Sequence, residues 1–263
     1  VAPAAMALEV FHNFTLLHDD VMDKAEVRRG RPTVHIQWNE NTAILSGDQM
    51  MIEAYKLLAE VPESKLHKVL RLFNEMATEI CEGQQYDVDF ESQEHVTIEE
   101  YLKMIRLKTS VLLATALQIG SYLVGANEAQ QEALYQFGTN VGLAFQIQDD
   151  ILDVWGDPKT FGKAVGGDIS CNKKTYVYLT AQKLADDELA EELHQWYGSV
   201  LDDNTEKIAA VKGIFEQLNV RAACEAVVED YTQKALLILD TLPQNAATEQ
   251  LRQLANKLNT RKD

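Results

Sequence analysis

The stretch HNFTLLHDDVMDKAEVRRGRPT, residues 12–33, joins an apolar run to a cluster of aspartates and then to a cluster of arginines. Its segment LLHDDVMD (16–23) shares the pattern apolar-x-D-D-x-x-D with the segment QIQDDILD (146–153). The two copies lie too far apart for a solenoid repeat. Their separation suits two helices that face each other across a bundle, so this pair of segments suggests how the chain folds.

The two aspartate motifs are candidate magnesium sites. On a helix, residues i and i+4 share a face, so Asp19 and Asp23 point the same way, as do Asp149 and Asp153. Like charges at this spacing repel, and a hard cation that prefers carboxylate and phosphate oxygens compensates them. One such motif is usually a solvated helix end, but two matched copies favour Mg²⁺. A zinc site or an EF-hand is disfavoured, because their ligand patterns are missing.

Basic residues follow both motifs. Each alone is more often a solvated surface charge, and only their combination with the aspartates indicates a diphosphate site. Gly30 and Pro32 predict a helix end that lets the arginines turn back toward the aspartates. The candidates are Arg28, Arg29, Lys108 beside Thr109, Lys163 in the glycine-rich loop, Lys173 and Lys174.

Composition narrows the class of protein. The 263 residues carry a formal net charge of −17, with 41 acidic against 24 basic residues, so nucleic acid is not expected as a partner. Three scattered cysteines indicate no disulfide framework and favour a reducing, cytoplasmic setting. The longest apolar stretch, 111–126, is shorter than the roughly 20 residues of a membrane span, and no signal peptide is visible.

Apolar residues recur at helical spacing through most of the chain, with almost no strand-like alternation. Turn signals at 60–64, 124–129, 155–168 and 242–247 divide this pattern into about nine or ten helices. Since no linker interrupts it, the sequence predicts a single all-α domain over residues 1–263, built as a helix bundle. The opening VAPAAMALEVFHNF (1–14) has the pattern of the middle of a helix, so we expect that an N-terminal part of the native domain precedes it.

Five motifs in order resemble those of the trans-isoprenyl diphosphate synthases, also called polyprenyl synthases. HDDVMDKAEVRRG (18–30) is similar to the first aspartate-rich motif of that family, and FQIQDDILDVWGD (145–157) to the second. EGQQYDVDFE (82–91) resembles its GQ-x-x-D segment, and KTS (108–110) its KT segment. FGKAVGGDISCNKKT (161–175) resembles its lysine-bearing loop. The resemblance implies an isoprenoid-synthase bundle with a deep central cavity, and a homodimer.

The resemblance also implies roles for individual residues. Three Mg²⁺ ions would be held or supported by Asp19, Asp20, Asp23, Asp149, Asp150 and Asp153, with Gln84 and Asp87 lining the metal side. The substrate-binding residues would be His12, Arg28, Arg29, Lys108, Gln146, Lys163 and Lys173, of which Arg28, Lys108 and Lys163 contact an allylic diphosphate and His12 and Arg29 contact isopentenyl diphosphate. The catalytic set would be Lys108, Thr109, Gln146 and Lys163, with Thr109 and Gln146 near the developing cation.

The implied reaction is the Mg²⁺-dependent head-to-tail condensation of isopentenyl diphosphate with a C5–C15 allylic diphosphate. Ionisation of the allylic diphosphate gives a cation that the double bond of isopentenyl diphosphate attacks, with the proton lost to the departing diphosphate. In this family the fifth residue before the first aspartate influences product length, and here it is Phe14, with Thr15 next and Phe11 a turn earlier. An aromatic ring there predicts a short C15 or C20 product.

The chain departs from the family in one respect, because nothing matches the basic GGKR-like segment that precedes the first aspartates and helps to hold isopentenyl diphosphate. Three other functions compete. A terpene cyclase shares the fold but normally carries an NSE-type second motif where this chain has DDILD. A non-catalytic regulatory subunit of a prenyl synthase commonly lacks some of the aspartates. A helical interaction domain would show no Mg²⁺-dependent diphosphate binding.

Overall fold

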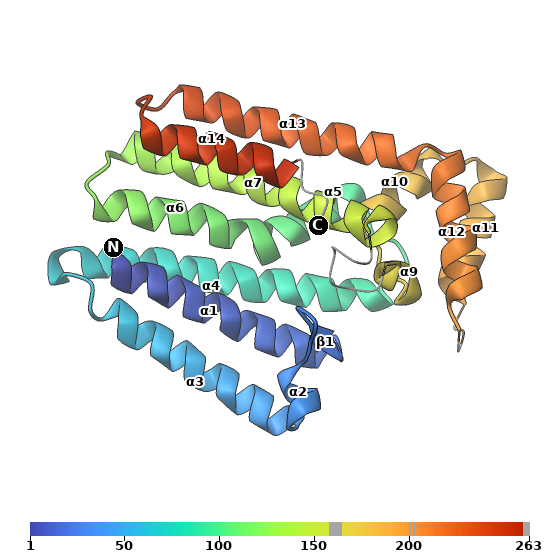
Figure 1. Cartoon of the computed structure of the whole chain (residues 1–263), viewed down its shortest axis with the longest axis horizontal. Helices are drawn as coiled ribbons and strands as arrows, with labels where there is room; N and C mark the ends of the chain where they lie inside the picture. The colour runs from blue at the N-terminus through green and yellow to red at the C-terminus, as the bar shows by residue number, and fades with distance from the viewer. Residues whose placement is uncertain (158–164, 200, 202, 260–263) are drawn as a thin grey trace.

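The computed structural model describes residues 1–157, 165–199, 201 and 203–259, and its framework is a bundle of long helices (Figure 1). The long helices are α1 (Ala2–Met22), α3 (Glu40–Leu58), α4 (Glu63–Ser92), α6 (Val111–Leu123), α7 (Glu128–Trp155), α13 (Val220–Asp240) and α14 (Ala246–Asn259). The remaining helices are α2 (Val34–Gln37), α5 (Ile98–Ile105), α9 (Gly167–Ser170), α10 (Tyr176–Leu184), α11 (Asp187–Gly198) and α12 (Thr205–Gln217). The predicted all-α class is confirmed.

Short polar signals in the sequence fix where the helices begin. The side chain of Asn127 accepts from the backbone N–H of Gln130, and the side chain of Gln130 accepts from the backbone N–H of Asn127. This pair of bonds is a capping box that starts α7. Thr97 and Glu100 form the same box at the start of α5. The predicted turns at 60–64, 124–129 and 242–247 separate α3 from α4, α6 from α7 and α13 from α14. These three turn predictions are confirmed, while half of the predicted 155–168 turn, residues 158–164, lies outside the described residues.

Three groups of buried apolar side chains hold the helices together. One lies between α1, α4 and α6 and includes Phe11 and Phe73. A second joins the end of α7 to α5, α10 and α12 and includes Ile147 and Phe215. The third packs the start of α7 against α13 and α14. Burying each large apolar side chain stabilises the fold by about 1.5–3 kcal/mol, so α7 is anchored along both halves, and the second aspartate motif sits on a fixed helix.

A five-residue π-helix, η1 (Arg106–Ser110), interrupts the run between α5 and α6. Glycines on both neighbours let it approach closely. A Cβ added at Gly83 of α4 would lie 2.3 Å from the backbone N of Lys108, and one at Gly142 of α7 would lie 2.5 Å from the Cα of Ser110. No real Cβ tolerates such contacts, so these glycines allow η1 to sit between α4 and α7. π-helical turns are frequent at functional sites.

Two features differ from the sequence prediction. The described residues contain more helices than expected, because α2 and α9 are too short to show a periodic pattern and η1 divides the run from Ile98 to Leu123. A two-stranded hairpin, β1 (Val27–Arg28) with β2 (Arg31–Pro32), was not predicted. In the described part of the chain no helix has the length and apolar character needed to cross a membrane.

Candidate active site

The hairpin returns Arg28 to the end of α1. Its turn residues Arg29 and Gly30 have φ values of 53° and 71°, the left-handed conformation that a tight two-residue hairpin turn requires. Arg28 consequently donates from Nε to Oδ1 of Asp20 at 2.7 Å and from Nη2 to Oδ2 of Asp19 at 3.1 Å. The structure thus brings the predicted arginine onto the first aspartate motif.

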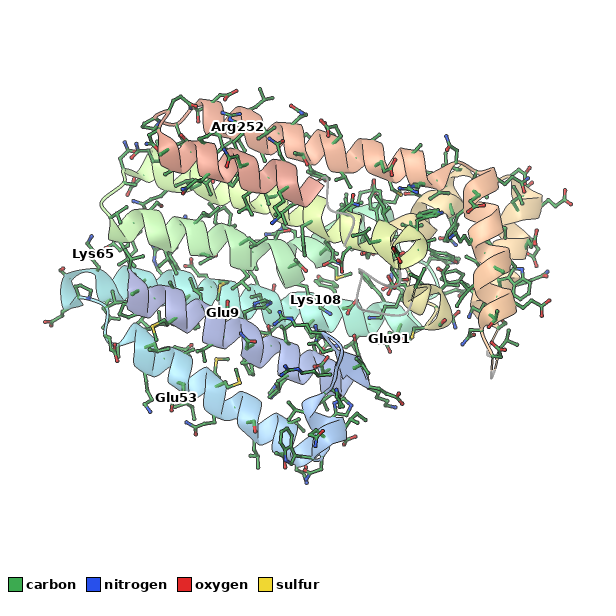
Figure 2. The ribbon with its side chains drawn as sticks, in the orientation of Figure 1. Glu9, Glu53, Lys65, Glu91, Lys108 and Arg252 are labelled. Atoms are coloured by element: carbon green, nitrogen blue, oxygen red, sulfur yellow. The ribbon has the colours of Figure 1, made fainter. Side chains whose placement is uncertain are left out.

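Lys108 of η1 joins two acidic segments that are distant in sequence. Its Nζ donates to Oδ1 of Asp19 at 2.9 Å and to Oδ2 of Asp87 at 2.6 Å, near the end of the bundle that carries the hairpin (Figure 2). Burial raises the pKa of Asp19, but the charges of Lys108 and Arg28 outweigh it, and the net shift is downward. Burial likewise opposes charge on Lys108, while Asp19 and Asp87 bring its pKa above the usual value. Asp19 and Lys108 therefore form an ion pair at neutral pH.

Asp150, the second aspartate of the second motif, is buried and fully engaged by protein donors. The hydroxyl of Tyr101 in α5 donates to its Oδ2 at 2.6 Å, and the backbone N–H of Tyr176 in α10 donates to the same oxygen at 3.0 Å. The amide of Gln146 donates to Oδ1 at 3.3 Å. Burial raises the pKa of Asp150 well above its usual value, against these hydrogen bonds. The side chain joins α5, α7 and α10.

Gln146 connects this buried network to η1. While its amide N–H donates to Asp150, its Oε1 accepts from the hydroxyl of Thr109 at 3.1 Å. Thr109 follows Lys108 directly in the chain, so Asp19, Lys108, Thr109, Gln146 and Asp150 form one continuous run of contacts. The predicted catalytic residues of the described chain, together with both aspartate motifs, therefore lie in one place.

The segment after the second motif folds back onto both motifs. Asp153 accepts from the backbone N–H of Asp168, at the start of α9, at 3.0 Å. Lys173, just beyond α9, donates to Oδ2 of Asp23 at 3.2 Å. The carboxylate neighbours of Lys173, Asp23 first among them, raise its pKa although burial alone would lower it. Lys173 is thus placed beside the first motif, whereas Lys163 lies outside the described residues.

The remaining predicted residues surround this centre. His12 is half-buried on α1, and burial lowers its pKa, with Arg29 and Arg28 acting in the same direction. Gln84 of α4 donates to the sulfur of Met22 at 3.5 Å, so it lies beside the end of α1. Asp149 is partly exposed on α7, in contrast to buried Asp150.

The predicted chain-length residues stand in a row of aromatic rings. Phe11 is fully buried and contacts Phe73 of α4 edge-on, with ring centroids 5.1 Å apart. Phe14 lies 5.5 Å from Phe11 and 4.7 Å from the ring of His18, and it is only partly buried. Thr15 bonds within its own helix to the carbonyl of His12. Phe14 is therefore held between two rings while part of its own ring stays accessible.

The oxygen donors of the two aspartate motifs fit a Mg²⁺ site that is shared with substrate. Among the described residues, no group of three or more His, Cys, Asp or Glu side chains is close enough to hold a metal ion by itself. Mg²⁺ is usually held by one or two carboxylates together with water and substrate phosphates, not by a complete protein cage. Oxygen-only motifs on two helices, with lysine and arginine beside them, fit that mode of binding.

Sequence reasoning missed two residues that shape the site. Gly83 enters the sequence prediction only as part of a motif, although an isolated glycine in a helical pattern signals close packing, here against Lys108. Tyr101 gave no signal, because its bond to Asp150 depends on how α5 packs against α7.

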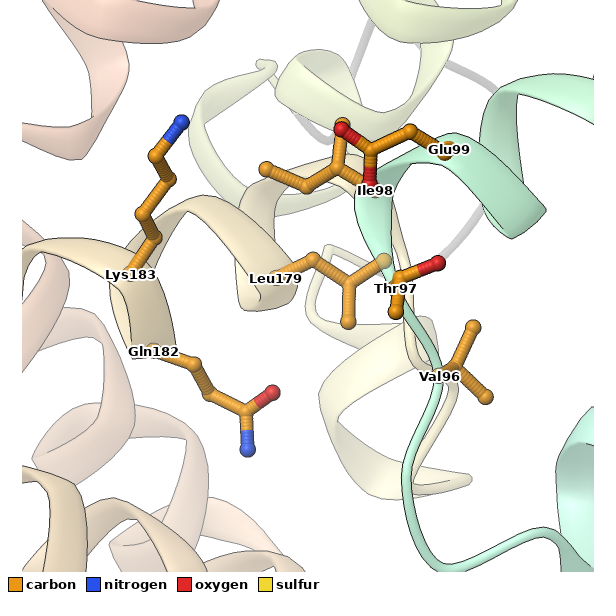
Figure 3. Close-up of a pocket in the computed structure, with 7 residues that line it drawn as sticks. All are labelled: Val96, Thr97, Ile98, Glu99, Leu179, Gln182 and Lys183. Atoms are coloured by element: carbon orange, nitrogen blue, oxygen red, sulfur yellow. The ribbon is translucent and has the colours of Figure 1, made fainter.

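A surface hollow of about 270 Å³ lies between the start of α5 and α10, lined by Val96, Thr97, Ile98, Glu99, Leu179, Gln182 and Lys183 (Figure 3). It contains no residue of the aspartate motifs and no arrangement of reactive groups. The motif residues, and not this hollow, form the candidate site.

A model of the polyprenyl synthetase family matches residues 1–218, and the chain belongs to that family. The short chain isoprenyl diphosphate synthase of Methanocaldococcus jannaschii is 44% identical over 200 residues, which cover 76% of this chain and 61% of that protein. The geranylgeranyl diphosphate synthase of Methanosarcina mazei is 44% identical over 183 residues, covering 69% of this chain and 56% of that protein. The chain spans less than two thirds of the length of either relative.

Solved structures extend the similarity along the whole chain. A geranylgeranyl pyrophosphate synthase is 47% identical with a TM-score of 0.93, covering 99% of this chain and 81% of that one. A polyprenyl synthase from Caulobacter crescentus, complexed with calcium and isoprenyl diphosphate, is 30% identical with a TM-score of 0.91, covering 99% of this chain and 78% of that one. The shared fold includes the helices that carry both aspartate motifs.

Proposed function

We propose that this protein is a Mg²⁺-dependent trans-prenyltransferase that condenses isopentenyl diphosphate with an allylic diphosphate to give a short-chain prenyl diphosphate. The observation that carries the proposal is the run of contacts from Asp19 through Lys108, Thr109 and Gln146 to Asp150. This chemistry needs carboxylates that bind metal ions and basic side chains that bind phosphate oxygens. It also needs polar oxygens that stabilise the allylic carbocation, which Thr109 and Gln146 would supply. The names of the relatives support the same reaction class.

The carboxylates would divide into ligands and supports. Asp19 and Asp23 on α1 and partly exposed Asp149 on α7 would hold three Mg²⁺ ions together with diphosphate oxygens. When bound, these ions would supply Lewis-acid stabilisation of the departing diphosphate. Asp20 and Asp150, which are buried and engaged by protein donors, would orient the ligand-bearing helices.

The basic residues would bind the substrates. Lys108 and Arg28, which donate to Asp19, would reorient toward the allylic diphosphate when metal ions take over the carboxylate. Lys173, beside Asp23, would contact the same diphosphate, with Lys163 as a further candidate. His12 and Arg29, which act on each other electrostatically, would hold isopentenyl diphosphate.

The reaction would break the allylic C–O bond and form a C–C bond between the allylic carbon and the double bond of isopentenyl diphosphate. Thr109 and Gln146 would direct their oxygens toward the positive charge that develops on the allylic carbons. The proton lost after coupling would go to the departing diphosphate, so no protein base is required. The apolar side chains of α1 and α4 would shield the cation from water.

Product length would be limited by Phe14, which precedes Asp19 by five residues on α1 and is partly accessible. The Phe14 ring, packed between the rings of Phe11 and His18, would stop the growing prenyl chain at farnesyl or geranylgeranyl length. The intact second motif and the synthase names of the relatives disfavour a terpene cyclase and a non-catalytic subunit.

A homodimer is the proposed assembly. One side of α3, at the lower edge of the molecule in Figure 1, exposes apolar side chains that an isolated bundle would leave in water. They are Ile44, Leu45, Ile52 and Tyr55, each exposed by 39% or more. The double variant Leu45→Glu and Ile52→Glu should halve the mass measured by analytical ultracentrifugation. If the variant keeps the mass of a dimer, α3 is not part of the interface.

The proposed compartment is the cytoplasm, since the thiols of Cys81 and Cys171 are exposed and unpaired.

The experiment that tests the proposed activity supplies isopentenyl diphosphate with dimethylallyl, geranyl or farnesyl diphosphate in turn and resolves products by mass. Elongated prenyl diphosphates that disappear with EDTA are expected. Cyclic hydrocarbons made without isopentenyl diphosphate would indicate a cyclase, and no turnover by folded protein would contradict the proposal.

A further inference from the structure

Lys207 of α12 is a cation inside the protein, and its ammonium group forms no ion pair with any carboxylate of the described residues. Its side chain has no exposed surface. Its Nζ donates to two neutral oxygens, Oδ1 of Asn172 at 2.5 Å and the carbonyl of Ser199 at 3.1 Å. A buried charge costs several kcal/mol unless it is well hydrogen-bonded, and burial lowers the pKa of Lys207 accordingly. Because this arrangement is unfavourable for stability, we expect its neighbours to supply a functional reason to keep Lys207 buried.

The residue that Lys207 holds occupies a sharp turn next to the candidate site. Asn172 has a φ of 58°, in the left-handed region, and its N–H donates to the carbonyl of Ile169 at 3.2 Å. Lys173 follows directly. Its backbone N–H donates to the carbonyl of Asp168 at 2.9 Å, and its Nζ donates to Oδ2 of Asp23 at 3.2 Å. The orientation of Asn172 therefore fixes where the Lys173 side chain leaves the backbone.

Helix α12 contacts the other end of the same segment. A Cβ added at Gly166 would lie 2.8 Å from the side chain of Ile208, the residue after Lys207. Gly166 also donates its N–H to the carbonyl of Asp153 at 2.6 Å. The segment from Gly166 to Lys173 is thus fixed between the second aspartate motif and α12, which runs across the end of the bundle (Figure 1).

We propose that Lys207 is a positioning residue that acts through Asn172 to hold Lys173 where it can bind a diphosphate. The inference rests on the proposed function, because it assumes that Lys173 contacts that ligand. Lys207 itself is enclosed and would touch no substrate. Its ammonium group instead bonds the Asn172 amide oxygen and the end of α11, so the turn cannot rotate Lys173 away from the first aspartate motif.

The test measures calorimetric binding of inorganic pyrophosphate in the presence of Mg²⁺, which needs no turnover. Lys207→Met keeps the buried stem and removes the charge, and Asn172→Gly keeps the left-handed turn and removes the acceptor. Each should weaken pyrophosphate binding by about tenfold, the loss expected when a charged hydrogen-bonding group is displaced. The matched control is Lys212→Met, a partly exposed lysine of the same helix, which should bind as the wild type does.

A double-mutant cycle separates positioning from general destabilisation. If Lys207 acts through Lys173, the penalty of Lys207→Met should vanish when Lys173→Met is already present. A penalty that persists in that background, or normal binding by both single variants, would overturn the inference while leaving the proposed function intact. Absence of Mg²⁺-dependent pyrophosphate binding in the wild type would overturn the proposed function itself.

Discussion

The ammonium group of Lys108 lies 2.9 Å from a carboxylate oxygen of Asp19, although 89 residues separate them in the chain. The π-helix η1 and the glycine contact with α4 create this pairing. A second oxygen, from Asp87, lies 2.6 Å from the same ammonium. Three of the sequence motifs consequently meet at one lysine.

Lys108→Met should lower stability at neutral pH more than at acid pH. Burial raises the pKa of Asp19, and Lys108 is the first of the groups that outweigh it. A carboxyl with a lowered pKa adds stability above its ordinary value of 3.8 and loses it as pH falls through the lowered value. The variant should lose about 1–3 kcal/mol of unfolding free energy at neutral pH, with a smaller difference near pH 3.

Urea unfolding at both pH values measures this difference. Lys56→Met is the matched control, because Lys56 makes a solvent-exposed pair with Glu53 and should change stability little at either pH. A loss for Lys108→Met that is the same at pH 7 and pH 3 would mean that its pairing with Asp19 is not the cause.

Substituting Asp150 should lower thermal stability, whereas substituting the neighbouring Asp149 should lower turnover. Asp150→Ala leaves the Tyr101 hydroxyl and the Tyr176 N–H without their acceptor, and each such loss costs about 1–3 kcal/mol. Asp149→Ala should leave thermal stability nearly unchanged while turnover falls by orders of magnitude. Calorimetric melting and product formation check both, and a folded, stable Asp150→Ala protein would contradict the network.

Gly83→Ala should disturb the site through the backbone. The new Cβ would meet the backbone N of Lys108 at 2.3 Å, so α4 and η1 must separate and the pairing of Lys108 with Asp19 weakens. A loss of about 1–3 kcal/mol and much lower turnover are expected. Gly120→Ala is the control, since a Cβ there meets nothing within 4 Å and should stabilise α6 by about 0.5–1 kcal/mol.

Phe14→Ala should lengthen the product. Removing the ring opens the space between Phe11 and His18 to additional isoprene units, whereas Phe14→Leu should have a smaller effect because it keeps more volume. Product masses with farnesyl diphosphate as primer measure the change. The same product distribution in the wild type and Phe14→Ala would exclude Phe14 as the limit on product length.

Local patterns in the sequence predicted the helical class, three turns and the return of Arg28 to the aspartates. Those features follow from short-range signals: periodicity, turn residues and Gly30. The burial of Asp150 could not be predicted, because the D-D-x-x-D pattern does not show which helices pack over its second aspartate. Burial of Asp150 comes from Tyr101 and α10, which approach through tertiary packing.

The buried lysine and the π-helix were also beyond local reasoning. Lys207 looks like any charge on an amphipathic helix until α12 is packed across the end of the bundle. Likewise, η1 continues the helical periodicity of its neighbours, and only the close contacts of Gly83 and Gly142 set it apart.

The most direct test of the central claim is a crystal structure grown with Mg²⁺ and an unreactive thio analogue of an allylic diphosphate. Metal ions are expected between the diphosphate and the carboxylates of Asp19, Asp23 and Asp149, with Lys108 and Lys173 donating to phosphate oxygens. A diphosphate bound away from both aspartate motifs, or metal ions that do not touch them, would contradict it.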